Sequence, residues 1–424
     1  MNLRENKFDI AVGLTSGFSA IEPILLASVI CEQGGADFSR TATALILSVA
    51  VGTFAVGLWG RCSLILAPSV PLAAFMTYET VLSRGLPWQK FTSALFIAGL
   101  LGLVALKFFP RSLTFLKFPP PLKWSLPIGV GFALIVEGMV QGRLALGAPL
   151  TIFMLGSLAD PTAFYTSLGL ILTSGLLIMG CRTALLIGMV AVAVLSFVEG
   201  FWIVPDAPFN LSTDLLRLVC CPDFSVTEEL GEWIGLVLLL LLLFMTETQA
   251  MLEIWRKVTS DTSPSEEQRI LACVLGANCL SAWLGGCGLR LAPESFVGAT
   301  VCKPGYKAAY VTALTILPLI FLLPLAKEMV SFTAIFAPAL IVTGTWLMGR
   351  GYAAVKDKNF TSGEAAAALT LILILGLTRD FLSGIGLALI LYIFLEVMEG
   401  KRYRITISEI IWAFLFALYF MIYG

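Results

Sequence analysis

The sequence predicts an all-α integral membrane protein built from fourteen membrane elements, arranged as two inverted repeats of seven. Three observations lead to this class: the composition, the spacing of apolar segments, and the distribution of basic residues between loops. Of the 424 residues, 58% are hydrophobic and 13% are charged, and the mean hydropathy is +0.92. Soluble domains carry about 25% charged residues. A chain this apolar is solvated mainly by lipid.

Apolar segments of membrane-spanning length recur along the whole chain. A helix needs about 20 apolar residues to cross the hydrocarbon core. The expected segments lie near 11–30, 41–60, 64–82, 91–108, 124–142, 164–181 and 184–203 in the first half, and near 233–254, 269–286, 288–302, 308–329, 332–349, 364–381 and 383–399 in the second. A further stretch at 406–423 either spans the membrane or lies in its interface.

Basic residues gather in alternate loops, as the positive-inside rule expects of cytoplasmic loops. With the N-terminus inside, the inside loops carry Arg61, Lys107, Arg111, Lys117, Lys123, Arg182, Arg256, Lys257, Lys303, Lys307, Arg350, Lys356, Lys358, Lys401, Arg402 and Arg404, and the outside minority is Arg84, Lys90, Arg143 and Arg217. Because each half has an odd number of segments, the halves are inverted. We predict a first repeat at 1–203, an extracytoplasmic loop at 204–231, a second repeat at 232–399 and a C-terminal apolar segment at 400–424.

Composition argues against several other classes. The polar stretch Met1–Asp9 does not resemble a cleaved signal peptide, and no basic patch suggests nucleic acid as a partner. The nine cysteines show no paired CxxC spacing, which favours reduced apolar residues in a bacterial inner membrane. A disulfide at Cys220–Cys221, in the outside loop, stays open. Histidine is absent, so we expect no metal or cofactor, and any proton coupling must use carboxylates.

Two of the weaker segments carry the same interrupted phrase. Leu66-Ala67-Pro68-Ser69 and Leu291-Ala292-Pro293-Glu294 each place a proline and a polar residue where a membrane helix should continue. Proline removes a backbone donor, and irregular backbone survives at membrane depth only where protein or a cavity surrounds it. Interrupted segments at matching places in two halves indicate the midplane binding site of a secondary transporter.

Charged residues inside apolar segments need a reason, since each costs about 2.5–3.5 kcal/mol near the bilayer centre. The set is Glu22, Glu79, Glu137, Glu199, Glu247, Arg290, Glu294, Arg379 and Asp380. Those near segment ends, Glu79, Glu199, Arg379 and Asp380, are expected to reach the interface. Glu137 lies deeper and is either a helix contact or a gate residue.

Three acids and one arginine fall on segments expected to surround the midplane. Glu247 stands in a polar patch well inside its segment, and Glu22 precedes Pro23 in the counterpart segment of the first half. Arg290 and Glu294, four residues apart, share one face if the backbone there is helical. We interpret these as substrate or coupling residues. The alternative is a set of buried ion pairs that lock helices together.

The chain also resembles a known family. The run from Leu64 to Tyr78, LILAPSVPLAAFMTY, is similar to the third-segment signature LAPGMGLNAFFTY of the AzgA-like branch of the nucleobase–cation symporters, the hypoxanthine, guanine and adenine permeases. Similar runs follow in order at 86–89, 96–101, 148–151 and 383–392. The resemblance covers most of the chain.

This resemblance implies a fold in which a core domain (elements 1–4 and 8–11) moves against a gate domain (elements 5–7 and 12–14). Elements 3 and 10 would be short extended strands followed by half-helices, with purine between them. The acids of elements 8 and 10 would fall on Glu247, which would hold the base, and on Glu294, which would hold it from the other side or relay a proton. The backbone and rings expected to complete the site are Ala73, Ala74, Phe75, Ser295 and Phe296, with Phe75 or Phe296 stacking on the base.

The expected activity is proton-coupled nucleobase symport, with Na⁺ as the other candidate ion and Glu294, Glu247 and Glu22 as coupling residues. The expected partners are the nucleobase, the coupling ion, the bilayer and, by analogy with the fold, a second copy in a homodimer. Departures from the family pattern lie at the substrate side: Arg290 replaces an uncharged residue, and Glu22-Pro23 replaces Asn-Pro. Arg290 therefore supports an alternative, a carboxylate, urate or inorganic anion carrier on the same fold. A membrane enzyme is disfavoured, because no nucleophile–base pair or phosphate loop is present.

Overall fold

The structure, a computed structural model, describes residues 3–108, 118–148, 151–209, 222–225, 230–258, 263–300 and 305–423. Much of the predicted loop at 204–231, with Arg217 and the Cys220–Cys221 pair, lies outside the described residues. The basic residues Arg111, Lys117 and Lys303 also lie outside them.

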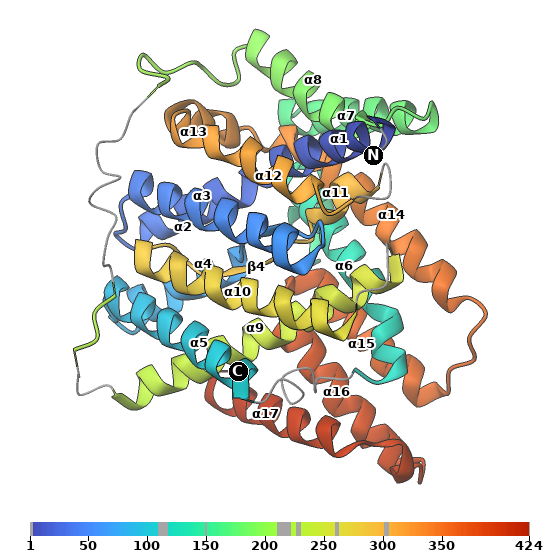
Figure 1. The fold of residues 1–424 in the computed structure, drawn as a ribbon. Coiled ribbons are helices and arrows are strands. Elements are labelled where there is room, and N and C mark those ends of the chain that lie inside the picture. The colour runs from blue at the N-terminus through green and yellow to red at the C-terminus, as the bar shows by residue number, and fades with distance from the viewer. Residues whose placement is uncertain are drawn as a thin grey trace.

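Helices dominate both halves (Figure 1). The first half contains α1 (Leu3–Ser19), α2 (Ile21–Gln33), α3 (Phe38–Ala55), η1 (Val56–Gly60), β1 (Leu66–Pro68), α4 (Val70–Ala74), η2 (Phe75–Ser83), α5 (Trp88–Phe108), α6 (Pro120–Gln141), β2 (Ala145–Gly147), β3 (Phe153–Leu155), α7 (Pro161–Ile178) and α8 (Ala184–Val198). The second half contains α9 (Leu230–Val258), α10 (Pro264–Leu284), β4 (Leu289–Leu291), α11 (Ser295–Ala299), α12 (Ala308–Ile316), η5 (Leu317–Ile320), α13 (Leu323–Ser331), η6 (Thr333–Ile335), α14 (Ala337–Val355), α15 (Ser362–Thr378), α16 (Phe381–Met398), η7 (Arg402–Arg404) and α17 (Ile407–Tyr423).

The predicted membrane class and element order are confirmed. Among the described residues, seven helices are long and apolar enough to cross a membrane, and one bent pair brings the number to eight. Shorter apolar helices are α8, α15 and the described part of α17. The predicted third and tenth elements are the broken ones, β1–α4–η2 and β4–α11.

Local sequence explains where several helices begin. Ser263 with Glu266, and Thr361 with Glu364, form capping boxes at the starts of α10 and α15. In each box the hydroxyl accepts the backbone N–H three residues on, and the glutamate carboxylate accepts the N–H of the capping residue. These helices therefore start where polar side chains replace the missing backbone partners.

The apolar segment expected near 308–329 is present, but it is a bent pair of helices rather than one continuous helix. The helical stretch Ala308–Ile320 is bent by 100° relative to Leu323–Ser331. Pro318 and Pro324 lie at this bend, and each lacks the N–H that would continue a helix. The next long helix, α14, consequently begins at Ala337, later than the expected start at 332.

Helices pack in two groups that follow the order of elements. Helices α1, α2, α3, α5, α10 and α12 form one connected set of contacts, and α6, α7, α14, α15 and α16 form a second set. In the second set Gly131 of α6 faces Gly344 of α14 so closely that a Cβ on Gly131 would meet the Gly344 carbonyl oxygen at 2.7 Å. Such small-residue contacts let membrane helices approach. The division into core and gate domains remains a prediction that this packing supports.

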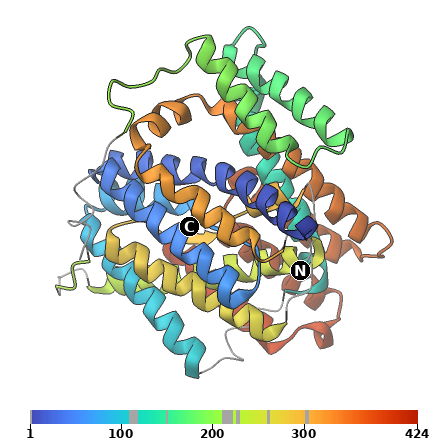
Figure 2. The same ribbon diagram turned by 45° about the horizontal axis from the view of Figure 1, so that its top comes forward.

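Helices α7 and α8 lie at one edge of the molecule in both views (Figure 2), and α17 lies at the opposite edge in Figure 1. The C-terminal apolar stretch is thus a helix, and it packs on α16. Phe416 of α17 is fully buried and fills the space above Gly386 of α16.

Candidate functional site

The two interrupted phrases meet in the middle of the fold. Strand β1 pairs with β4 in antiparallel register, with Leu66 opposite Leu291 and Ala67 opposite Arg290. The pairing extends beyond the strands, because Ser69 N–H donates to Gly288 at 3.0 Å and Ala292 N–H donates to Ile65 at 2.9 Å. Each broken element therefore supplies the backbone partners that the other lacks, which bilayer burial requires.

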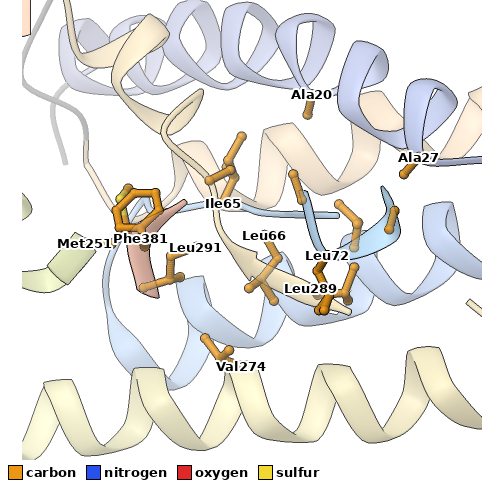
Figure 3. Close-up of a cluster of buried hydrophobic side chains, with 14 of the residues drawn as sticks. Ala20, Ala27, Ile65, Leu66, Leu72, Met251, Val274, Leu289, Leu291 and Phe381 are labelled. Carbon is orange, nitrogen blue, oxygen red and sulfur yellow. The ribbon is translucent and has the colours of Figure 1, made fainter. Parts of the chain in front are cut away.

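Buried apolar side chains surround this pairing (Figure 3). Leu66, Leu289 and Leu291 project from the two strands toward their neighbours, and Val274 of α10 lies below them. Phe381 and Met251 lie beside Leu291. The breaks are thus enclosed by packed protein on the sides that this view shows.

Polar side chains fix the unwound backbone in place. The Ser295 hydroxyl accepts from Ile65 N–H at 3.0 Å and donates to the Ala292 carbonyl at 2.6 Å. The Asn278 amide pairs with both backbone groups of Leu289, at 2.7 and 2.9 Å. The Ser295 hydroxyl, in a residue predicted to bind substrate, is therefore engaged inside the protein.

A cavity of about 170 Å³ opens between the first break and three other regions of the chain. Its lining residues are Ser69, Pro71, Leu72, Phe75, Leu239, Leu243, Glu247, Arg379, Asp380, Leu382 and Tyr419. A cavity of roughly 150 Å³ is large enough to hold one benzene ring. The space therefore suits a small planar solute.

Of the predicted site residues, Glu247 and Phe75 line this cavity. Ala73 is fully buried in α4, and its N–H donates to the Ser69 carbonyl at 2.8 Å. Ala74 is half-buried and follows in the same short helix. Phe296 is fully buried, with its ring 5.9 Å from Trp255 and away from the residues that line the cavity. Of the two rings expected to stack on a base, Phe75 is the one placed to do so.

Glu247 and Arg290 form a loose ion pair. Arg290 Nη1 lies 3.8 Å from Glu247 Oε1, and both side chains are about 95% buried. This separation exceeds a hydrogen bond. Among the described residues, Glu247 Oε2 and Arg290 Nε have no hydrogen-bond partner. The guanidinium also faces the Phe381 ring at 5.6 Å. Buried charged groups whose hydrogen bonds are not all formed can bind a further partner.

Glu294 does not share a helical face with Arg290. Arg290 lies in strand β4, whereas Glu294 precedes α11, so the helical spacing of four residues does not apply. Glu294 is buried, and its Oε2 has no hydrogen-bond partner among the described residues. It therefore faces the interior as a second incompletely bonded acid.

A second group of charges forms a continuous hydrogen-bonded chain. Gln141 Nε2 donates to Glu22 Oε1 and, at 3.2 Å, to Glu137 Oε1. Arg379 Nη2 donates to the same Glu137 oxygen and forms an ion pair with it. Glu22 lies on α2 and Glu137 on α6, so the chain crosses between the two groups of helices.

Arg379 and Asp380 were expected to reach the interface, but both line the cavity. They form the break between α15 and α16, where Asp380 accepts from Leu382 N–H at 2.9 Å. Arg379 has a φ of +59°, in the left-handed region that favours glycine. Helix α15 has 17 residues, and at about 1.5 Å per residue it is shorter than the bilayer core. The short apolar run before Arg379 was the sequence signal that could have placed these charges beside the cavity.

The other two charges near segment ends lie closer to the surface. Glu79 is half-exposed and bonds Arg84 at 2.9 Å, and Glu199 is exposed. Tyr419 is a further lining residue that sequence reasoning missed. Its hydroxyl bonds Ser383, whose own hydroxyl donates to Asp380. No feature of the sequence placed this helix beside the third element.

Comparison with known proteins agrees with this architecture. No family model matches the chain. It is 25% identical to the guanine/hypoxanthine permease PbuO of Bacillus subtilis, over 97% of this chain and 96% of that one. It is 24% identical to the adenine permease AdeP of Escherichia coli, over 97% and 92%. The chain is a relative of nucleobase permeases. The resemblance predicted from the sequence is confirmed, and the protein is a transporter rather than an enzyme.

Among solved structures, the transmembrane domain of the cyanobacterial bicarbonate transporter BicA has a TM-score of 0.55 with this chain. The match covers 91% of this chain and 99% of that domain, at 17% identity. This likeness concerns the fold alone. This chain therefore has a fold that is also found in a bicarbonate transporter.

Proposed function

We propose that this protein transports a purine or closely related nucleobase across the bacterial inner membrane, coupled to protons. The observation that carries the proposal is the cavity of about 170 Å³ in which the Glu247 carboxylate and the Phe75 ring meet beside the first break. The permease names of the full-length relatives support the same substrate class.

The chemistry of the cavity fits a nucleobase edge. A carboxylate only accepts hydrogen bonds. A purine presents N–H groups that can donate hydrogen bonds to Glu247 Oε2. An aromatic ring such as Phe75 supplies a stacking face. Asp380 and Tyr419 line the same cavity from α16 and α17, and they bring further polar groups to the site.

Coupling must use carboxylates, since the chain has no histidine. Glu247, Glu294 and Glu396 are buried acids that lack a hydrogen-bond partner on one oxygen among the described residues. Of these, Glu247 and Glu294 belong to the elements around the paired breaks, and Glu22 lies on the α2 side of the hydrogen-bonded chain. We assign proton coupling to these three acids, with Na⁺ as the other candidate. An elevator-like motion of a core domain against a gate domain would carry the site across the membrane. We also propose that the N-terminus lies in the cytoplasm and that the protein forms a homodimer.

The anion alternative rests on Arg290. Its Nε and Nη1 have no hydrogen-bond partner among the described residues, and a buried guanidinium holds carboxylates well. Glu247 nevertheless lies beside Arg290, whereas the guanidinium is not among the lining residues of the cavity. The nucleobase proposal accounts for the cavity more directly.

A competition panel tests the proposal. Radiolabelled hypoxanthine, guanine and adenine are offered to cells that lack their own purine permeases and express this chain, with pyrimidines and small anions as competitors. We expect purine-dependent uptake that is lost in Glu247→Gln and reduced by a protonophore. If Arg290→Gln abolishes binding of an anion while neutral purines never compete, the anion alternative replaces the proposal.

Purified protein offers an independent measurement. A ligand present at 100 times its dissociation constant stabilises the folded state by about 2.7 kcal/mol. A thermal-shift screen against purines, pyrimidines and anions should therefore single out purines. A screen in which no purine shifts the unfolding temperature would contradict the proposal.

A further inference from the structure

A cluster of basic side chains lies around Trp124, at the membrane face that the loop charges assign to the cytoplasm. Lys257 Nζ lies 3.6 Å from the centre of the Trp124 ring, and Lys358 Nζ lies 4.2 Å from it. Two ammonium groups thus share one aromatic ring. Cations are attracted to the ring face, but two like charges held at the same ring repel each other.

The nearby carboxylates are occupied by other cations. Glu253 accepts from Arg256 at 2.7 Å and pairs with Lys123 at 3.5 Å. Glu267 pairs with the same arginine at 3.2 Å. Lys257 and Lys358 therefore add two positive charges to a group whose bonded acids are already matched.

Lys257 is the least satisfied member of the cluster. Its Nζ is buried and has no hydrogen-bond partner among the described residues. An ammonium group has three donors and no acceptor, so a buried one without a partner is costly. An anion with several acceptor oxygens would satisfy these donors and reduce the repulsion between the two lysines.

The location indicates which anion. Lys257 lies in the last turn of α9, Trp124 lies near the start of α6, and Lys358 follows α14. These three helices contact one another. Basic sites between membrane helices at the cytoplasmic face bind the head groups of anionic lipids. We propose that Lys257, Lys358 and Trp124 form a binding site for a phosphate group, as carried by an anionic phospholipid or by a soluble phosphate compound.

Occupancy of this site has a mechanical consequence. A phosphate held by Lys257 and Lys358 joins the end of α9, which packs on α5 and α10 of the first group, to α6 and α14 of the second group. Bound phosphate therefore resists relative movement of the two groups. The binding itself is measured without transport, so it stands or fails independently of the proposed substrate.

The test uses the purified full-length chain in a neutral detergent. Dissociation constants are measured for short-chain phosphatidylglycerol, for phosphatidylcholine of the same chain length, and for inorganic phosphate, by native mass spectrometry and thermal shift. The variant is Lys257→Gln/Lys358→Gln. The matched control is Arg350→Gln, which removes another cation held over a tryptophan, 5.5 Å from the Trp346 ring.

We expect phosphatidylglycerol to bind more tightly than phosphatidylcholine, and the double variant to weaken it by about 10–30-fold, as expected for two basic contacts. Binding of phosphatidylglycerol alone identifies a lipid head group, and equal binding of inorganic phosphate identifies a soluble ligand. The inference is overturned if neither phosphate probe binds more tightly than phosphatidylcholine, or if Arg350→Gln loses as much affinity. Should the double variant fail to fold, Lys358→Gln, at an exposed position, must still weaken binding several-fold.

Discussion

Two buried acids in this protein face an arginine in different ways. Glu137 Oε1 accepts hydrogen bonds from both Arg379 and Gln141, and Gln141 also donates to Glu22. Glu247 stands 3.8 Å from Arg290, and its second oxygen has no hydrogen-bond partner among the described residues. Both acids are more than 90% buried.

The difference distinguishes an acid bonded by neighbouring side chains from an acid with hydrogen-bonding capacity left for a ligand. A buried acid that is fully engaged by its neighbours holds helices together and leaves nothing for a ligand. A buried acid whose hydrogen-bonding capacity is only partly used is costly in the empty protein and gains most when a donor arrives. Glu137 accepts two hydrogen bonds on Oε1 and is closer to the first description, whereas Glu247, which lines a cavity, is closer to the second.

Glu137→Ala should have the largest effect on stability. It leaves Arg379 and Gln141 without their shared acceptor, and removal of one partner of a buried ion pair costs about 3–5 kcal/mol. We expect a lower unfolding temperature, measured by loss of the monodisperse peak after heating. The control is Glu79→Ala, which breaks the half-exposed pair with Arg84 and should cost less than about 1 kcal/mol. Equal losses in the two variants would remove the distinction between the acids.

Glu247→Gln should show the opposite pattern. The substitution keeps the size of the side chain but replaces a carboxylate, which only accepts hydrogen bonds, by an amide that keeps one acceptor oxygen and adds an NH₂ donor. We expect apparent purine affinity to fall by about 100-fold, equivalent to about 2.7 kcal/mol. Loss of the charge beside Arg290 should lower the unfolding temperature less than Glu137→Ala does, because the 3.8 Å separation is too long for a hydrogen bond. Uptake kinetics and thermal unfolding of the same preparation check both parts. Wild-type purine affinity in this variant would contradict the assignment of Glu247 to substrate binding.

Phe75→Ala tests the stacking face. Base–aromatic stacking is worth about 1–3 kcal/mol by alanine substitution, so we expect roughly tenfold weaker purine binding. Phe296→Ala is not a suitable control, because that ring is fully buried against Trp255 and its loss disrupts the core. Phe75→Leu keeps apolar volume without the ring. It should bind as weakly as Phe75→Ala if stacking matters, and like the wild type if only volume does.

The sequence predicted the fold well because the bilayer imposes strong rules. Apolar length located the elements, and the prolines at Pro68 and Pro293 located the breaks that pair as β1 and β4. The 100° bend after Ile320 was missed, since hydropathy does not report direction.

The site was predicted less completely. Glu247 and Phe75 were found because each lies in a recognisable phrase. Arg379 and Asp380 were assigned to the interface because their depth depends on how short and how inclined α15 is. Tyr419 was missed because contacts between helices far apart in sequence depend on packing, which the sequence alone does not show.

Tyr419→Phe should give the smallest effect and tests whether α17 belongs to the cavity. The substitution removes the hydroxyl that bonds Ser383 and leaves the ring. One hydrogen bond is worth about 0.5–1.5 kcal/mol, so we expect purine affinity to fall by about 2–10-fold. The control is Trp412→Phe on the same helix, which lines an apolar groove against α9 rather than the polar cavity. A larger loss of purine affinity in Trp412→Phe than in Tyr419→Phe would mean that α17 acts through packing. The polar groups of the site would then come only from the elements up to α16.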